Sequence, residues 1–233
     1  MSELLHFAEH RLQEVALLFM GIVYILRIRW YLKFKAGKER QAPTKNEKFN
    51  HTKGVVYSWA NIAMPWAMES TRKKFFLYVQ FVIFHIGVTA SIVLSFIIPY
   101  VPEWLGKFPF LVRVFQAPIA GAFLVGIYRI YRRFSQPIMR AISTPDDYFS
   151  LILLTVWFFF AFFAAPNNYE EREKILLIYF FMTAFFLVYV PFSKISHYLY
   201  YPFTRYYFGK SMGHRGVYPF KRSVKPNRPV SAS

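Results

Sequence analysis

Residues Phe75–Tyr100 form the stretch FFLYVQFVIFHIGVTASIVLSFIIPY, which decides the fold class. The stretch contains no Asp, Glu, Lys or Arg, and its apolar residues are continuous rather than alternating as they are in a membrane-barrel strand. A helix that crosses a bilayer needs about 20 apolar residues at a rise of about 1.5 Å each. The stretch therefore predicts a transmembrane helix.

Four further apolar blocks extend this pattern along the chain. They run from about Leu12 to Leu26, Phe110 to Tyr131, Tyr148 to Ala165 and Ile175 to Tyr201. The two shortest, the first and the fourth along the chain, are accepted as spans because their neighbours must be connected through the membrane. The predicted fold class is therefore an all-α integral membrane protein, a bundle of five helices in a lipid bilayer.

The composition agrees with this fold class and excludes others. The chain is 55% hydrophobic and 18% charged, whereas soluble domains have about 45–50% apolar and about 25% charged residues. Its net charge of +17 does not indicate nucleic acid, because the basic residues lie in the gaps between the apolar blocks. The absence of cysteine excludes disulfides, iron–sulfur ligation and thiolate zinc sites within this chain. The first ten residues, MSELLHFAEH, lack a basic n-region, so no cleaved signal peptide is predicted.

The distribution of Lys and Arg predicts the orientation. Of the 29 basic residues, 24 lie in residues 27–74, 129–140 and 194–233, which the five spans place on one side. Short basic loops face the cytoplasm. We therefore expect a multi-pass protein of the inner (cytoplasmic) membrane with its N-terminus outside and its C-terminus in the cytoplasm.

The first cytoplasmic loop and the C-terminus each suggest a further feature. Residues 36–54 are polar and read as a solvated loop, whereas residues 55–71, VVYSWANIAMPWAMEST, are apolar and aromatic but are broken by Pro65. They predict an interfacial helix in the first cytoplasmic loop. The predicted domains are a membrane domain over residues 1–209 and an extended basic cytoplasmic tail over residues 210–233.

Two of the six histidines, His85 and His197, fall inside apolar blocks. His85 lies about 15 Å along the second helix from its cytoplasmic end, and His197 lies close to the cytoplasmic end of the fifth. An ionisable residue within a span is a candidate functional residue. Two neutral imidazoles at similar depth on facing helices are the arrangement that ligates a b-type haem iron. The alternative is that each histidine is only hydrogen-bonded within the bundle.

The neighbourhood of the two histidines suits a haem. Gly87 follows His85 within FHIGVTAS and would let a flat macrocycle approach the helix. Cations for the propionates are available on the same side of the membrane, namely Lys194, Arg205, Arg129 and the run Arg72, Lys73 and Lys74. The remaining histidines are predicted to be surface or solvated residues: His6, His10, His51 and His214.

Three stretches carry a resemblance to a known family. Pro191–Lys210, PFSKISHYLYYPFTRYYFGK, resembles the end of the last helix in the gamma subunit of respiratory nitrate reductase and its relatives. Phe84–Val88, FHIGV, resembles the ligand motif of the family's second helix, and Tyr131–Leu154 resembles its third-to-fourth-helix connection. The relatives include cytochrome b subunits of heterodisulfide reductases and of redox complexes in sulfate-respiring organisms.

The resemblance implies five spans, bis-histidine haem b and quinone chemistry. The nitrate reductase subunit carries two haems, with two histidines on each ligand helix. The positions that correspond to the second pair are Ser95 and Tyr179 in this chain, and neither ligates haem in the usual way. We therefore expect one haem b, held by His85 and His197, and no second haem at those positions. Whether His6 or His10 holds another haem stays open.

The leading hypothesis is a membrane-anchor cytochrome b subunit of an anaerobic respiratory complex. It would move electrons between a quinone, such as menaquinone, and a cytoplasmic iron–sulfur subunit, as part of a quinone-linked oxidoreductase rather than as a stand-alone enzyme. Lys194, Tyr198 and Trp66 are candidates for lining the quinone pocket, and a periplasmic multihaem cytochrome c is a further candidate partner. The alternatives are a haemless membrane scaffold that anchors a redox complex and a small transporter, although the spans contain few polar residues.

Overall fold

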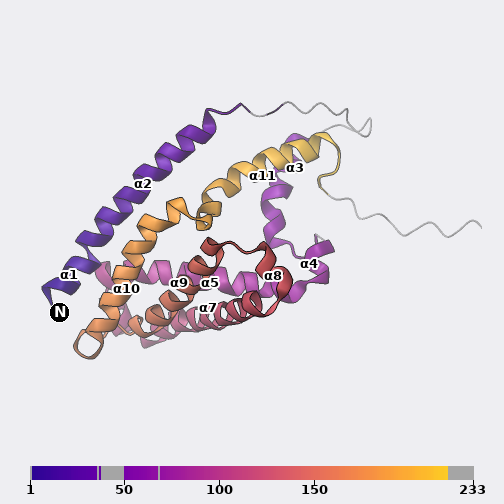
Figure 1. Cartoon of the computed structure of the whole chain (residues 1–233). Coiled ribbons are helices and arrows are strands. Elements are labelled where there is room, and N and C mark those ends of the chain that lie inside the picture. The colour runs from indigo at the N-terminus through magenta and orange to yellow at the C-terminus, as the bar shows by residue number, and fades with distance from the viewer. Residues whose placement is uncertain (1, 36, 38–49, 68, 220–233) are drawn as a thin grey trace, which may run out of the picture. The chain divides into compact units, whose positions relative to one another are not determined.

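The computed structural model describes residues 2–35, 37, 50–67 and 69–219 (Figure 1). Within these residues the chain forms helices and turns and no strand. The helices are α1 (Glu3–Glu9), α2 (Arg11–Leu32), α3 (His51–Ala60), η1 (Asn61–Ala63), α4 (Glu69–Lys73), α5 (Phe75–Tyr100), α6 (Glu103–Lys107), α7 (Pro109–Ser135), α8 (Pro137–Ile142), α9 (Pro145–Ala164), α10 (Tyr169–Tyr189), η2 (Val190–Phe192), η3 (Lys194–Ser196) and α11 (His197–His214).

Five helical stretches of the described chain are long and apolar enough to cross a membrane. They are Glu3–Leu32, Phe75–Tyr100, Pro109–Ser135, Pro145–Ala164 and Tyr169–Phe192. Large apolar side chains of the first stretch are open to the surroundings, and Val15, Leu18 and Ile25 are each at least 65% exposed. Such surfaces are stable in lipid and costly in water. The predicted all-α five-helix membrane fold is confirmed.

The chain divides into two compact units, of which the first consists of residues 1–33 and 76–197. In this unit α7 packs along α9, α9 packs on α10, and α10 packs on α2, as Figure 1 shows. The core of the unit contains side chains that are fully buried: Leu94, Ile119, Phe158, Tyr179 and Phe180. The first unit therefore contains all five spans.

Helix α5 is fixed in the first unit by close contacts with three other helices. Gly87 faces α7, where a Cβ on Gly87 would lie 2.8 Å from the Pro118 carbonyl oxygen. Phe84 meets Phe158 of α9 edge-on at 5.3 Å, and the Tyr179 hydroxyl of α10 donates to the Ser91 carbonyl at 2.6 Å. A small residue at position 87 thus lets α5 and α7 approach closely, as is typical of membrane helices.

The fifth apolar block is not one helix. Helix α10 ends at Tyr189, and the chain continues through the short turns η2 and η3 before α11 begins at His197. Pro191 has no backbone N–H, so the helical ladder is interrupted there, and Ser193 is extended with φ −96° and ψ 171°. The sequence predicted a continuous helix to about Tyr201, whereas the structure places His197 just after a break.

The second unit consists of residues 34–75 and 198–233, and in its described part α3 pairs with α11. Gly54, Gly209 and Gly213 form the contact, where a Cβ on Gly54 would lie 2.5 Å from the Gly209 carbonyl oxygen. Trp59 Nε1 donates to the Pro202 carbonyl at 2.9 Å, and Arg205 Nε donates to the Ser58 carbonyl at 3.0 Å. The predicted interfacial segment therefore contributes a helix that is tied to α11.

The predicted loop and tail fall partly on described residues. Within the predicted loop, residues 50–54 cap and begin α3. Gly37 is also described, whereas residues 36 and 38–49 lie outside the described residues. Helix α11 continues through Lys210 to His214, into the segment predicted to be an extended tail. Residues 220–233 of that tail lie outside the described residues.

Candidate functional site

The first unit brings the two predicted ligand histidines together. The ring centroids of His85 and His197 lie 6.4 Å apart, with an angle of 81° between the ring planes. An imidazole nitrogen lies about 2.0 Å from the metal that it binds, so two rings on opposite sides of one ion have centroids about 6 Å apart. The spacing of the pair fits two axial ligands of a single iron.

Backbone carbonyls orient both rings. His85 Nδ1 donates to the Phe81 carbonyl at 2.7 Å, and His197 Nδ1 donates to the Lys194 carbonyl at 3.0 Å. A histidine whose Nδ1 is held in this way presents Nε2 as its ligating nitrogen, and the second bond fixes the tautomer and the ring orientation. Both histidines therefore have the hydrogen bond that metal-ligating histidines usually make.

Aromatic rings and one cation surround His85. The Phe81 ring centroid lies 4.1 Å from that of His85, and the Phe84 ring lies 6.2 Å away, edge-on. Arg129 of α7 places its guanidinium carbon 4.8 Å from the centroid of the Phe84 ring. Arg129, one of the cations named from the sequence, thus contacts an aromatic neighbour of His85.

Lys194, which the sequence proposed as a propionate partner, has an anionic partner within the protein. Its Nζ donates to Asp147 Oδ2 at 2.9 Å and to Thr144 Oγ1 at 2.8 Å, and its backbone N–H donates to Asp146 Oδ2 at 3.3 Å. Asp147 also completes a capping box with Thr144 at the start of α9. The sequence indicated the helix start but missed that the same carboxylate binds the turn before His197.

A second contact joins the start of α9 to the end of α10. The Tyr189 hydroxyl donates to Asp146 Oδ1 and lies 2.8 Å from Ser150 Oγ. Together with the Asp147–Lys194 pair, this contact fastens both ends of the break at 190–196 to the first turns of α9. We name Asp146, Asp147, Tyr189 and Lys194 the α9 clamp. The clamp thus ties the segment that directly precedes His197 to the start of α9.

Gly87 and Arg205 have other surroundings than those expected of haem contacts. Gly87 is buried against Pro118 and Ala122 of α7, so helix packing accounts for its missing side chain. Arg205 belongs to the second unit, where it donates to Ser58 and lies 5.2 Å from the centroid of the Phe208 ring. Of the predicted site residues, His85, Lys194 and His197 are in the first unit with Gly87, and Arg205 is in the second.

The positions of the family's second histidine pair hold hydrogen-bonded side chains. Tyr179 is fully buried and donates to the Ser91 carbonyl, while Ser95 Oγ donates to the Ile92 carbonyl at 2.7 Å. These bonds satisfy polar groups within an apolar core.

The other histidines form two close pairs. The rings of His6 and His10 lie 4.8 Å apart in the first unit, and those of His51 and His214 are stacked at 5.9 Å in the second. His10 also meets the Tyr100 ring edge-on at 5.6 Å. Among the described residues, no group of three or more His, Cys, Asp and Glu side chains is placed to hold a metal ion.

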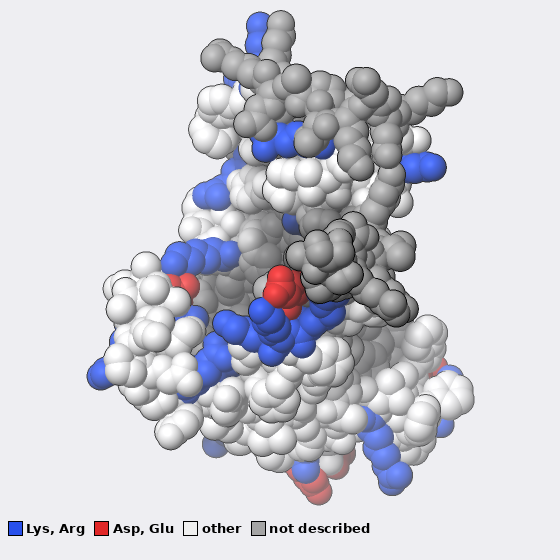
Figure 2. Space-filling view, turned by 90° about the vertical axis from the view of Figure 1, so that its right-hand side faces the viewer, with Lys and Arg blue, Asp and Glu red and all other residues white. Residues whose placement is uncertain are grey.

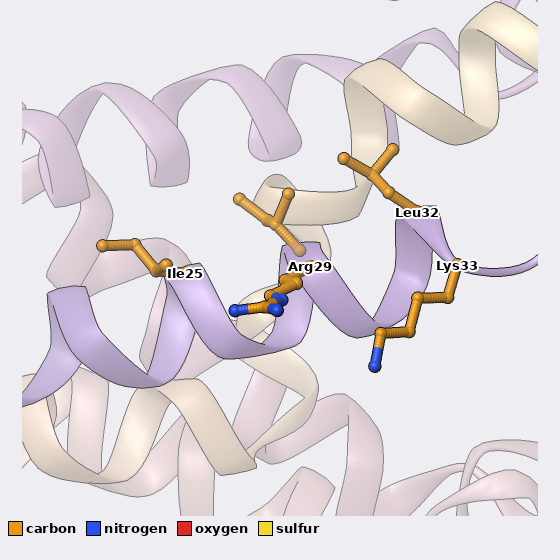
Figure 3. A pocket seen from close by; sticks show the side chains of 5 residues that line it. Ile25, Arg29, Leu32 and Lys33 are labelled. Carbon is orange, nitrogen blue, oxygen red and sulfur yellow. The ribbon is translucent and has the colours of Figure 1, made fainter.

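A hollow on α2 is lined by no pair of side chains that could ligate a metal as His85 and His197 could. It is lined by side chains of this helix alone, Ile25, Ile28, Arg29, Leu32 and Lys33, and Figure 3 shows the cations beside the apolar residues. Long basic side chains at the end of a span commonly reach along the apolar surface towards water. We therefore read the hollow as part of the surface of a membrane helix.

The comparisons add no family to these observations. Neither the protein-family models nor the curated proteins contain a match to this chain. The candidate site therefore depends on the geometry of His85 and His197 and on the resemblance stated above.

Proposed function

We propose that the chain is a membrane-anchor cytochrome b subunit that carries electrons through one haem b bound by His85 and His197. The observation that carries the proposal is the pair of imidazoles at 6.4 Å, each held by a backbone carbonyl. A bound haem would supply one-electron transfer within the membrane. The family resemblance of Phe84–Val88 and Pro191–Lys210 points to the same chemistry.

The residues around the pair would hold and shield the group. His85 and His197 would supply the two axial nitrogens, and Phe81 and Phe84 would keep water from the ring edge. Arg129 would balance a propionate charge, because it is a cation that lies against the Phe84 ring, which neighbours His85. The α9 clamp would hold His197 in its position.

The proposed setting is the inner membrane of a respiring cell, with the N-terminus outside and the C-terminus in the cytoplasm. The basic loops support this orientation. A quinone, such as menaquinone, would exchange electrons with the chain, and a cytoplasmic iron–sulfur subunit would be the second partner. A periplasmic multihaem cytochrome c is a candidate third partner.

A reduced-minus-oxidised spectrum of the purified chain tests the proposal. We expect a b-type band that is lost in His85→Ala and in His197→Ala, because either substitution removes one axial nitrogen. His51→Ala is the matched control, since it removes an imidazole from the second unit, and it should leave the band unchanged. A chain without the band, or an undiminished band in His85→Ala, would contradict the haem assignment.

The rival function is a haemless scaffold that anchors a redox complex. Under this reading the carbonyl bonds of His85 and His197 serve only to satisfy polar atoms in the bundle. The scaffold predicts no b-type band and a complex that still assembles when both histidines are replaced by Ala. Co-purification of partner subunits with the double variant measures the second point.

A further inference from the structure

The second unit carries most of the positive charge of the protein. Residues 34–75 and 198–233 hold 16 of the 29 basic residues but only three of the 12 acidic ones. Among the described residues of this unit, eight are basic and one, Glu69, is acidic. Figure 2 shows one view of the molecule in which Lys and Arg side chains outnumber acidic ones. Basic residues of a chain that is already in a membrane attract anionic lipids.

A hollow of about 350 Å³ lies where α3 meets α11 in this unit. Its lining is His51, Thr52, Val55, Val56, Trp59, Tyr206 and Lys210. A long bond joins its two walls, since His51 Nδ1 donates to the Lys210 carbonyl at 3.4 Å. The hollow thus combines one lysine and one imidazole with apolar and aromatic side chains.

The apolar part of the hollow is open. Val56 is 55% exposed, Trp59 44% and Tyr206 40%, although the indole N–H of Trp59 is already bonded to Pro202. Trp and Tyr are enriched where protein meets the headgroup region, because their rings are apolar with one polar atom. The residues suit a ligand that has an acyl or glycerol part next to an anionic group.

The chain connects the second unit directly to membrane spans. Helix α5 begins two residues after α4 ends, and α11 begins five residues after the fifth span ends at Phe192. Helix α11 is thus attached to a span through a short segment, whereas residues 61–74 separate α3 from α5. An acidic protein surface would match the charge, but it would not account for the exposed aliphatic and aromatic lining.

We propose that the α3–α11 hollow binds an anionic phospholipid of the surrounding bilayer. Lys210 and His51 would face the phosphate, and Val56, Trp59 and Tyr206 would contact the glycerol and the first acyl carbons. The proposal concerns the second unit alone and is independent of haem, so the spectrum described above and the experiment below can fail separately.

Fluorescence quenching by brominated lipid tests the proposal in the full chain. Because the chain has no cysteine, Tyr207→Cys introduces a single site for an environment-sensitive label on α11, at an exposed residue that follows Tyr206 and does not line the hollow. The labelled chain is reconstituted into phosphatidylcholine vesicles that contain a minor fraction of brominated phosphatidylglycerol or of brominated phosphatidylcholine. We expect the anionic lipid to be enriched at the label by about fivefold, the effect of one basic residue near a lipid phosphate.

Three variants in the labelled chain locate the effect. Lys210→Gln should abolish the preference, and Lys210→Arg should keep it because the charge remains. Lys73→Gln is the matched control, since it removes an equal charge from the same unit at a residue paired with Glu69 at 2.6 Å, and it should keep the preference.

Three outcomes would overturn the proposal. Equal quenching by the two lipids would show that the hollow does not select the anionic headgroup. Equal loss in Lys210→Gln and Lys73→Gln would show attraction by overall charge rather than a site. The third outcome compares two salts added to the same vesicles at equal ionic strength. If inorganic phosphate abolishes the preference and chloride does not, the hollow is a site for free anions.

Discussion

At the scale of single residues, the candidate site depends on hydrogen bonds that orient two rings. His85 and His197 each donate Nδ1 to a carbonyl of their own segment, Phe81 and Lys194 respectively. The sequence could indicate both histidines because they are the two histidines that fall inside apolar blocks. It could not indicate the orientation of the His197 ring, because this depends on the turn that precedes His197.

The first prediction concerns haem stoichiometry. We expect one haem per chain, because Ser95 and Tyr179 stand where the nitrate reductase subunit has its second pair of histidines. We expect the double variant His6→Ala with His10→Ala to keep this haem, because the proposed ligands are His85 and His197. Haem extraction and quantification against protein measures both values. Two haems per chain, or a loss of haem in the double variant, would assign a ligand role to the pair at 4.8 Å.

At the scale of helices, the break between α10 and α11 is the feature on which the site depends. Pro191 interrupts the helix, and the α9 clamp fixes the turns that follow. If the helix were continuous through residue 201, the direction of the His197 side chain would be set by the helical periodicity of α10 and not by the turns that precede it. The clamp therefore links the capping of α9 to the position of a candidate ligand.

The second prediction removes one clamp carboxylate. Asp147→Ala should lower the free energy of unfolding by about 1–2 kcal/mol, because it removes a capping box and a partly exposed ion pair with Lys194. Equilibrium unfolding of the detergent-solubilised chain measures this. Glu103→Ala is the control, because its pair with Lys107 is exposed on both sides, and its effect should be close to zero.

The third prediction tests the contact between α5 and α7. Gly87→Ala should lower the free energy of unfolding by about 1–3 kcal/mol, because the new Cβ would meet the Pro118 carbonyl and the Ala122 side chain. Gly21→Ala is the matched control in another span, where no atom beyond its chain neighbours and the nearby backbone of its own helix lies within 4 Å of the new Cβ. It should have no destabilising effect, and equal losses in the two variants would contradict the packing role of Gly87.

Much of the fold could be predicted from the sequence, because lipid imposes one constraint on every span. Long apolar blocks located α5, α7 and α9 to within a few residues, and Thr144 with Asp147 marked the start of α9. The break after Tyr189 was not located, although Pro191, Ser193 and Lys194 stand there in the sequence, because proline and polar residues also occur near the ends of continuous membrane helices. The α3–α11 pair was also missed, because its glycines are far apart in the chain and their approach is a tertiary contact.

At the scale of the whole molecule, charge and apolarity are divided between the two units. The first unit contains the five spans, while the second has 16 of the 29 basic residues. This division agrees with an insertion directed by basic loops. It also separates the candidate electron carrier from the candidate lipid site, so each can be altered without the other.

The fourth prediction tests the orientation. In the cysteine-free chain, Glu3→Cys should react with a membrane-impermeant maleimide on intact cells, and Lys73→Cys should react only after lysis. Both positions are exposed, so a difference in labelling reports the side of the membrane. The reverse pattern would place the basic loops outside and would contradict the proposed cytoplasmic partner.

The histidine pair joins a residue of the second span to one that follows the fifth. During synthesis, His197 leaves the ribosome only after all five spans have been made, so the pair cannot exist in any shorter nascent chain. A haem held by both imidazoles would therefore complete its ligation late, in a nearly finished and already inserted protein. A chain that stops after Phe192 would still have every span but would lack one of the two proposed ligands.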